Sequence, residues 1–295
     1  MIDYDHQHWA TTTLAWRGTV LSRLRNRILL YGGWAAVVTV AAAGRTVPMP
    51  DFGALAHSLV GVAMGMLLVF RTNASYDRYW EGRKRWGGII AGARNLVRVA
   101  RSHVGFTGPL PRLAHAYAVS VMEELRDATK EESLVPIVGP EMAAAACQRG
   151  NPPTFLATAM SHWVATRVAA GDLNAPLARE LEGALTKMVE HQEACERILH
   201  TPVPFAYVVQ IRQLLAFYLV TLPVVLVPVM DWMVIPVTAM VAFAMLGIEE
   251  AGIEIEDPFG DDPNDLPLER LCDLIRDDAA QVGAITDAEL ESVPG

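Results

Sequence analysis

The oxygen-rich stretch that follows the last apolar run is the part of the chain whose residue types and spacing are most suggestive of chemistry. Residues 254–265 read EIEDPFGDDPND, and the prolines and the glycine of this stretch favour turns. Calcium takes six to eight oxygen ligands, and the twelve-residue order of an EF-hand loop is not present. The residues alone therefore favour a solvated acidic loop over a calcium site.

The other residues that could ligate a metal or catalyse a reaction form no known pattern. His6 and His8 make an H-x-H pair without a third ligand at a fixed spacing, so we expect them to be solvated or structural. The sequence contains no H-E-x-x-H, G-x-S-x-G or Walker motif. Its three cysteines are far apart, which predicts neither a disulfide framework nor a zinc site. Enzymatic activity is not predicted.

The composition is that of a membrane protein. Of the 295 residues, 52% are hydrophobic and only 19% are charged, and the mean hydropathy is +0.25. The net charge of −9 is unevenly spread, because arginines cluster in residues 78–101 and acids crowd the tail after Glu249. That pattern does not predict a nucleic-acid partner. No cleavable signal peptide is visible at the N-terminus.

Four apolar runs predict four transmembrane helices in two antiparallel hairpins. They are residues 28–43, 52–70, 214–229 and 233–246. The organisation that follows is a cytosolic segment at 1–24, a transmembrane hairpin at 25–70, a helical cytosolic body at 71–204, a second hairpin at 205–247 and an acidic cytosolic tail at 248–295. The arginines flanking the runs place both termini in the cytoplasm, by the positive-inside rule.

The second apolar run has features of its own. It carries a face of glycine, alanine and serine residues, which is typical of close helix packing in membranes and also compatible with a pore-lining helix. His57 lies inside this run, so we expect it either to face a pore or a neighbouring helix or to sit at the membrane interface. After Phe70 the apolar run ends at Arg71, and a basic, aromatic helix continues without a turn signal.

Three separated segments resemble the bestrophin family, and in particular its bacterial branch. Residues 16–20 read WRGTV, residues 70–83 read FRTNASYDRYWEGR, and residues 257–262 read DPFGDD. Their order and spacing extend over nearly the whole chain. The resemblance implies a homopentameric ion channel in the bacterial inner membrane, with four transmembrane helices per subunit, long cytosolic helices and a central pore.

The resemblance also implies which residues line that pore. The second transmembrane helix lines an apolar neck, which would fall at Leu55, Leu59 and Ala63, with Val62 in place of Ala63 if the register shifts by one residue. A cytosolic aperture follows a proline that opens a helix, which selects Leu177 after Pro176.

Eukaryotic members hold calcium in a clasp on the acidic loop after the last transmembrane helix. The residues that match this candidate clasp are Asp262 and Asp265, with Asp257 and Asp261 nearby, and Pro263 and Asn264 interrupt the acidic run seen in those members. Bacterial relatives generally lack calcium control.

The family implies passive flux of small monovalent ions, and chloride-type anions are the first expectation. Some bacterial relatives favour monovalent cations, and an apolar ring does not select the sign of an ion. Two further alternatives are a membrane-anchored scaffold or regulator with a vestigial pore and, third, a membrane enzyme. The expected partners are other copies of the chain, membrane lipid and monovalent ions.

Overall fold

The computed structural model describes residues 20–44, 53–286 and 289, and it consists of helices joined by turns and short linkers, with no strand in these ranges. The predicted all-α fold is confirmed for this part of the chain. The described residues form two compact units. The first contains the residues up to Tyr79 together with Pro202–Asp257 and Asp262–Asp265, and the second contains Trp80–Thr201, Pro258–Asp261 and the residues from Leu266 onward.

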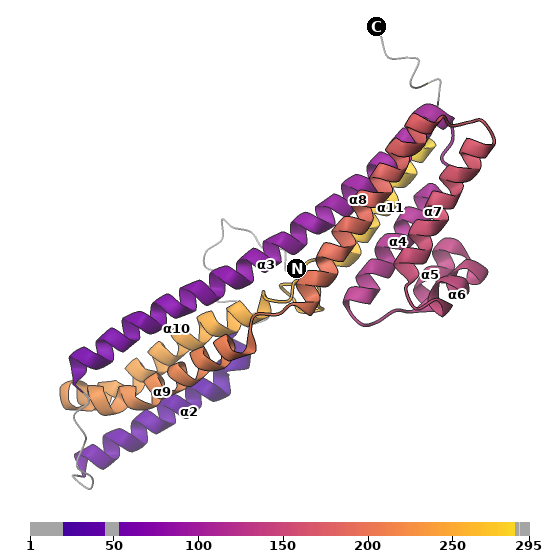
Figure 1. Ribbon diagram of the computed structural model, residues 1–295. Helices are drawn as coiled ribbons and strands as arrows, with labels where there is room; N and C mark the ends of the chain where they lie inside the picture. Colours follow the sequence, from indigo (N-terminus) through magenta and orange to yellow (C-terminus); the bar gives the residue numbers. More distant parts are fainter. Residues whose placement is uncertain (1–19, 45–52, 287–288, 290–295) are drawn as a thin grey trace. The chain divides into compact units, whose positions relative to one another are not determined.

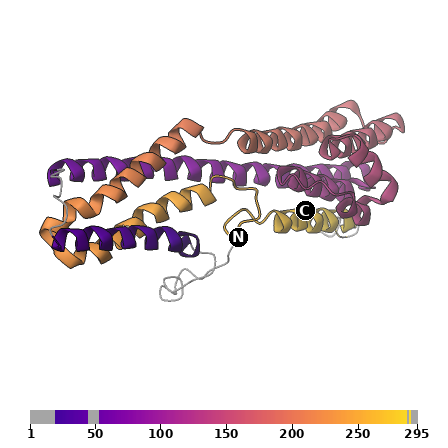
Figure 2. The same ribbon diagram turned by 90° about the horizontal axis from the view of Figure 1, so that it is seen from below.

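Helix α3 is the element that both units share. It runs without interruption from Ala54 to Val104, over 51 residues, and Figure 2 shows it as one helix. No proline occurs in this range, and Gly53 precedes the helix in a positive-φ conformation (φ 64°) that suits glycine. The prediction that the apolar run continues into a basic helix without a turn is confirmed.

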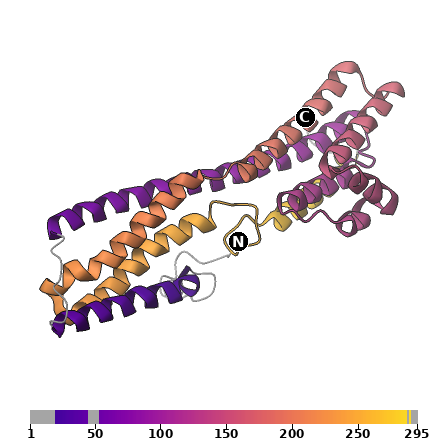
Figure 3. The same ribbon diagram turned by 60° about the horizontal axis from the view of Figure 1, so that its bottom comes forward.

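The first unit packs apolar helices around a small core. Its other helices are α2 (Val20–Ala43), α9 (Phe205–Met230) and α10 (Val234–Glu254), with the 3-10 turn Asp231–Met233 between the last two. Helices α2, α9 and α10 lie side by side in Figures 1 and 3. Leu24, Met64, Leu219 and Leu246 are buried together in the core.

Membrane-spanning potential is confined to three helical stretches of the described residues. They are Val20–Ala43, Ala54–Val104 and Phe205–Glu254, the last of which contains both α9 and α10. Pro223 and Pro228 lie inside the continuous helix α9. Membrane-spanning helices tolerate proline where neighbouring helices, Ser or Thr side chains or local adjustments of the helix satisfy the freed backbone groups. Helix α2 begins at Val20, so its first turns carry the arginines that precede the apolar run.

The second unit is a bundle of shorter helices around the later part of α3. They are α4 (Leu110–Leu125), α5 (Glu131–Val138), α6 (Pro140–Gln148), α7 (Pro152–Ala169), α8 (Ala175–His200) and α11 (Leu268–Ala284). Helix α4 packs against α7 and α11, and α7 packs against α8. Helix α8 has Pro176 in its first turn, and its buried face includes Leu181, Leu185 and Met188, which recur at helical spacing.

Candidate functional site

One apolar stripe of α3 faces away from the core of the first unit. Leu55, Leu59 and Val62 are 77%, 65% and 66% exposed, and Met66 continues the stripe. Met64 and Leu68, in contrast, are buried. At about 100° per residue, the spacing of four, three and four residues keeps the stripe on one side of the helix. The first unit therefore presents a row of uncovered apolar side chains along α3.

The predicted neck residues relate to this stripe in different ways. Leu55, Leu59 and Val62 lie within the stripe. Ala63 is also exposed, and it lies about 100° around the helix from Val62. Met66 was missed by the sequence reasoning, which used a uniform spacing of four residues. A spacing of four drifts around a helix of 3.6 residues per turn, and this drift is the signal that would have included Met66.

The opposite side of the same segment packs against α9. The His57 ring stacks on the Tyr218 ring with centroids 4.3 Å apart, and His57 Nε2 lies 3.1 Å from Thr221 Oγ1. A Cβ at Gly61 would lie 2.7 Å from Tyr218 Oη. Of the alternatives for His57, the structure supports contact with a neighbouring helix. The small residue at 61 is explained by close packing, since any side chain there would collide with Tyr218.

Leu177 lies in the first turn of α8. The Asn174 side chain caps this helix by accepting a hydrogen bond from the Leu177 backbone N–H at 3.0 Å. Pro176 lies in the same turn, and the Leu177 side chain is partly exposed. Proline and the cap together fix where α8 begins, so the position of Leu177 is well determined within the second unit.

The acidic segment holds its carboxylates in separate contacts. Asp262 forms an ion pair with Arg23 at 2.8 Å, and Asp261 forms one with Arg126 at 3.2 Å. Asp265 is only 3% exposed, and its Oδ2 accepts a hydrogen bond from the Asp262 backbone N–H at 2.7 Å. Burial raises the pKa of Asp265 from 3.8 to about 6. The fourth aspartate of the candidate clasp, Asp257, is exposed.

These contacts do not fit a calcium site. Calcium needs six to eight oxygens directed at one point, whereas two of the four aspartates are paired with arginines and a third is turned toward backbone. Over the described ranges, no group of three or more His, Cys, Asp or Glu side chains is arranged to hold a metal ion. His6 and His8 lie outside the described residues, as do residues 16–19 of the first motif.

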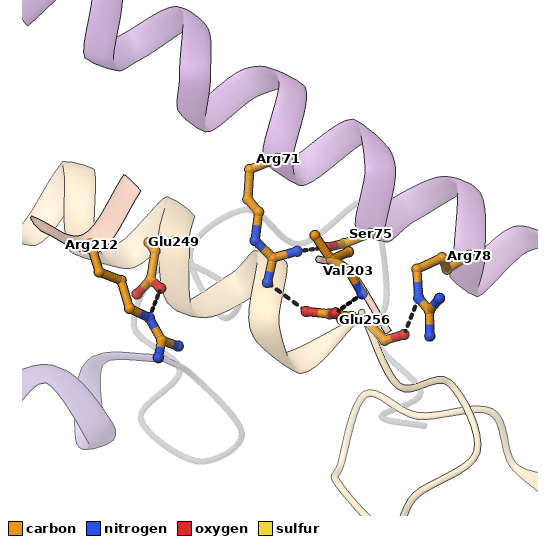
Figure 4. Close-up of polar contacts among 7 residues, drawn as sticks. All are labelled: Arg71, Ser75, Arg78, Val203, Arg212, Glu249 and Glu256. Carbon is orange, nitrogen blue, oxygen red and sulfur yellow. Dashed lines mark hydrogen bonds and ion pairs between the residues drawn. The ribbon is translucent and has the colours of Figure 1, made fainter. Parts of the chain in front are cut away.

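A polar network lies where the apolar part of α3 ends (Figure 4). Arg71 is 2% exposed, and it donates to Ser75 Oγ at 2.7 Å and to Glu256 Oε2 at 2.5 Å. The other carboxylate oxygen of Glu256 accepts from the Val203 backbone N–H at 2.9 Å. The Glu256 carbonyl oxygen accepts from Arg78 Nε at 3.0 Å. Glu256 thereby joins α3, the α8–α9 linker and the residues just after α10.

Two further ion pairs occur near the ends of the apolar helices. Arg212 Nε lies 2.8 Å from Glu249 Oε1, and Arg27 Nη1 lies 3.1 Å from Glu250 Oε2. The sequence reasoning missed Glu249 and Glu256 as structural partners, because it assigned both to an acidic tail. Their one available signal was that they occur within or directly after an otherwise apolar helix, where an acid needs a partner.

Comparison with known proteins now identifies the family. A sequence family described as Bacterial/Fungal Bestrophin protein matches residues 1–281. The chain belongs to the bestrophin family. The predicted resemblance is thereby confirmed, and it covers nearly all of the sequence.

The relatives of this bestrophin are similar over most of their length. A voltage-dependent anion channel-forming protein of Nostoc sp. is 33% identical over 279 residues, which are 92% of this chain and 90% of that protein. A voltage-dependent anion channel-forming protein of Escherichia coli, YneE, is 29% identical over 297 residues, 100% of this chain and 98% of that protein. A crystallised variant of a bacterial bestrophin homolog from Klebsiella pneumoniae shares the fold. It has a TM-score of 0.84 and 24% identity, and the alignment covers 89% of this chain and 100% of that one.

The Arg71–Glu256 pair is expected to be essential for stability. Replacing Arg71 with methionine leaves Glu256 largely buried without its cation, which should cost about 3–5 kcal/mol of unfolding free energy. The double variant Arg71→Met/Glu256→Gln should be less destabilised than Arg71→Met, since glutamine can still accept from Val203. The matched control is Arg276→Met, which breaks ion pairs whose members are all about half exposed and should therefore change the stability little. Thermal unfolding in detergent measures all three, and equal melting temperatures for Arg71→Met and Arg276→Met would contradict the expectation.

The buried Asp265 is expected to make stability depend on pH. Its pKa is raised on folding, so the folded protein holds the proton more tightly than the unfolded chain between about pH 4 and pH 6. This contribution to stability is complete below pH 4 and is lost as the pH rises through 6. In Asp265→Asn the same loss should be absent. Melting temperatures of the wild type and of Asp265→Asn, measured between pH 4 and pH 8, test this expectation. The same dependence of melting temperature on pH in both proteins would contradict it.

Proposed function

We propose that this bestrophin is a subunit of a homopentameric channel for passive flux of small monovalent anions of the chloride type. In this proposal α2, the first part of α3, α9 and α10 cross the bacterial inner membrane, and both termini are cytoplasmic. The observation that carries the proposal is the apolar stripe of Leu55, Leu59, Val62 and Met66, which the subunit leaves uncovered. The anion preference is supported by the relatives, several of which are named voltage-dependent anion channel-forming proteins.

Five copies of the stripe around an axis would form the neck. A narrow ring of leucine and valine offers no hydrogen bonds to water, so small changes in its radius would gate conduction by dewetting. Ala63 would lie at the edge of such a ring. Leucine has the same volume as isoleucine, but alanine is much smaller than the isoleucine and phenylalanine common in family necks, so we expect a neck that includes Ala63 to be wider there than in those members.

A second constriction is proposed at Leu177, where the capped start of α8 would present one side chain per subunit to the axis. Opening this ring should change ion selectivity or rectification more than gating. The proposed cytosolic part comprises residues 71–204 and 248–295, and no step of the proposal uses calcium.

A monovalent cation channel is the second candidate, and one side chain favours it. Asp77 is exposed and lies on the same side of α3 as Leu59, five turns further along the helix. Five aspartates below the neck would concentrate cations near the axis, as rings of acidic side chains do in cation channels. The anion proposal requires other charges to outweigh this ring.

The neck is tested by Leu59→Ala in planar bilayers. Removing three carbons from each of five side chains should widen the ring and raise the single-channel conductance without loss of assembly. The control is Val60→Ala, which shortens a neighbouring exposed side chain on another side of α3. Equal conductance in wild type and Leu59→Ala would show that Leu59 does not line the neck.

The sign of the permeant ion is read in the same recordings. Under a KCl gradient, the reversal potential should move toward the chloride equilibrium potential. A reversal potential near that of potassium would replace the anion proposal by the cation alternative. Absence of current from a protein shown to be pentameric would favour the scaffold interpretation.

A further inference from the structure

A groove of about 300 Å³ opens on the surface of the first unit. It is lined by residues from three helices, α2, α9 and α10. Its polar lining comes from Arg27, Arg212 and Glu249, and its apolar lining includes Leu30, Leu215 and Leu246. A site with cations at one end and aliphatic side chains at the other suits a molecule that is itself charged at one end and apolar at the other.

The acids of this region lie behind its arginines. The Arg27 and Arg212 side chains are each 54% exposed, whereas those of their partners Glu250 and Glu249 are 12% and 4% exposed. Arg212 uses Nε for its acid, and Figure 4 shows both of its terminal nitrogens pointing away from Glu249. A ligand entering the groove therefore meets guanidinium groups, although each arginine also forms an ion pair with a less exposed glutamate.

The groove lies at the depth of lipid headgroups in the proposed membrane orientation. Arg27 and Arg212 come directly before the apolar runs that begin at Ile28 and Leu214, and Glu249 follows the run that ends at Leu246. Arginine at such a boundary binds phosphate through paired N–H donors, and basic pockets between transmembrane helices on the cytoplasmic side bind anionic headgroups.

We infer that this groove binds the headgroup phosphate of an anionic phospholipid of the inner leaflet. Arg27 and Arg212 contact the phosphate, and one acyl chain lies along Leu30, Leu215 and Leu246. This inference rests on the membrane orientation given under the proposed function, but not on conduction through the neck. A zwitterionic lipid gains less, because the carboxylates that could pair with its ammonium group are already ion-paired with the two arginines and are only 12% and 4% exposed.

The test compares lipid binding by charge-balanced variants of the full-length protein. The variant Arg27→Gln/Glu250→Gln removes one ion pair, and adding Arg212→Gln/Glu249→Gln removes both, with the net charge unchanged. The control is Arg25→Gln, because Arg25 is exposed on α2 at nearly the same depth but about 200° around the helix from Arg27. Native mass spectrometry gives the affinity of each protein for dioleoyl-phosphatidylglycerol and dioleoyl-phosphatidylcholine.

The wild type should prefer phosphatidylglycerol. This preference should fall about fivefold in the first variant and about 30-fold in the second, as expected for one and two arginines at an anionic surface. Arg25→Gln should change it less than either. Elution volume and melting temperature check folding, and the first variant keeps the test valid if the second does not fold, since it retains Arg212 and Glu249.

Three outcomes would overturn the inference. The first is an unchanged preference for phosphatidylglycerol in the folded variants. The second is a larger effect of Arg25→Gln than of either variant, which would indicate bulk electrostatics. The third is an equal affinity for free glycerol 3-phosphate, which would indicate a site for a soluble anion. Chloride flux in liposomes separates this inference from the proposed function. Chloride flux without a headgroup preference would count against the proposed lipid site alone. Absence of flux in every lipid would count against the proposed channel.

Discussion

The ion pair between Arg71 and Glu256 is the interaction on which the first unit depends. Arg71 ends the apolar part of α3, and it is buried at the point where a charge is costly to leave unpaired. Glu256 satisfies it and at the same time accepts from Val203 and, through its carbonyl oxygen, from Arg78. One carboxylate thus fixes the end of the apolar segment of α3 against two segments that come much later in the sequence. The direction of the outward stripe on α3 follows from this anchoring.

The two sides of α3 show how packing and exposure are divided along one helix. On the inner side, Gly61 admits the Tyr218 ring, and His57 stacks on it. On the outer side, Leu55, Leu59, Val62 and Met66 find no partner within the described subunit. Exposed apolar surface of this extent marks a functional surface. The proposed pore uses the outer side of α3, and the proposed lipid groove uses Arg27 of α2 and Arg212 of α9.

Local features could be predicted from the sequence, and long-range partners could not. The unbroken helix after Phe70 follows from the absence of turn signals, and the start of α8 follows from Asn174 and Pro176. The family was predicted from three short motifs. The partners of Glu249 and Glu256 were missed, because the residues that pair with them are 37 and 185 positions away and no periodicity records such a distance. The candidate calcium clasp followed from the family resemblance, which cannot show that Asp261 and Asp262 are each paired with an arginine.

The central claim is that the stripe of α3 lines a water-filled axis, and cysteine accessibility tests it most directly. In a background lacking the three native cysteines, Leu59→Cys and Val60→Cys would each be exposed to a charged, water-soluble thiol reagent during bilayer recording. The account predicts that the reagent blocks current through Leu59→Cys and leaves Val60→Cys unaffected. Block of Val60→Cys with no effect on Leu59→Cys would contradict it, since the axis would then lie on another side of α3.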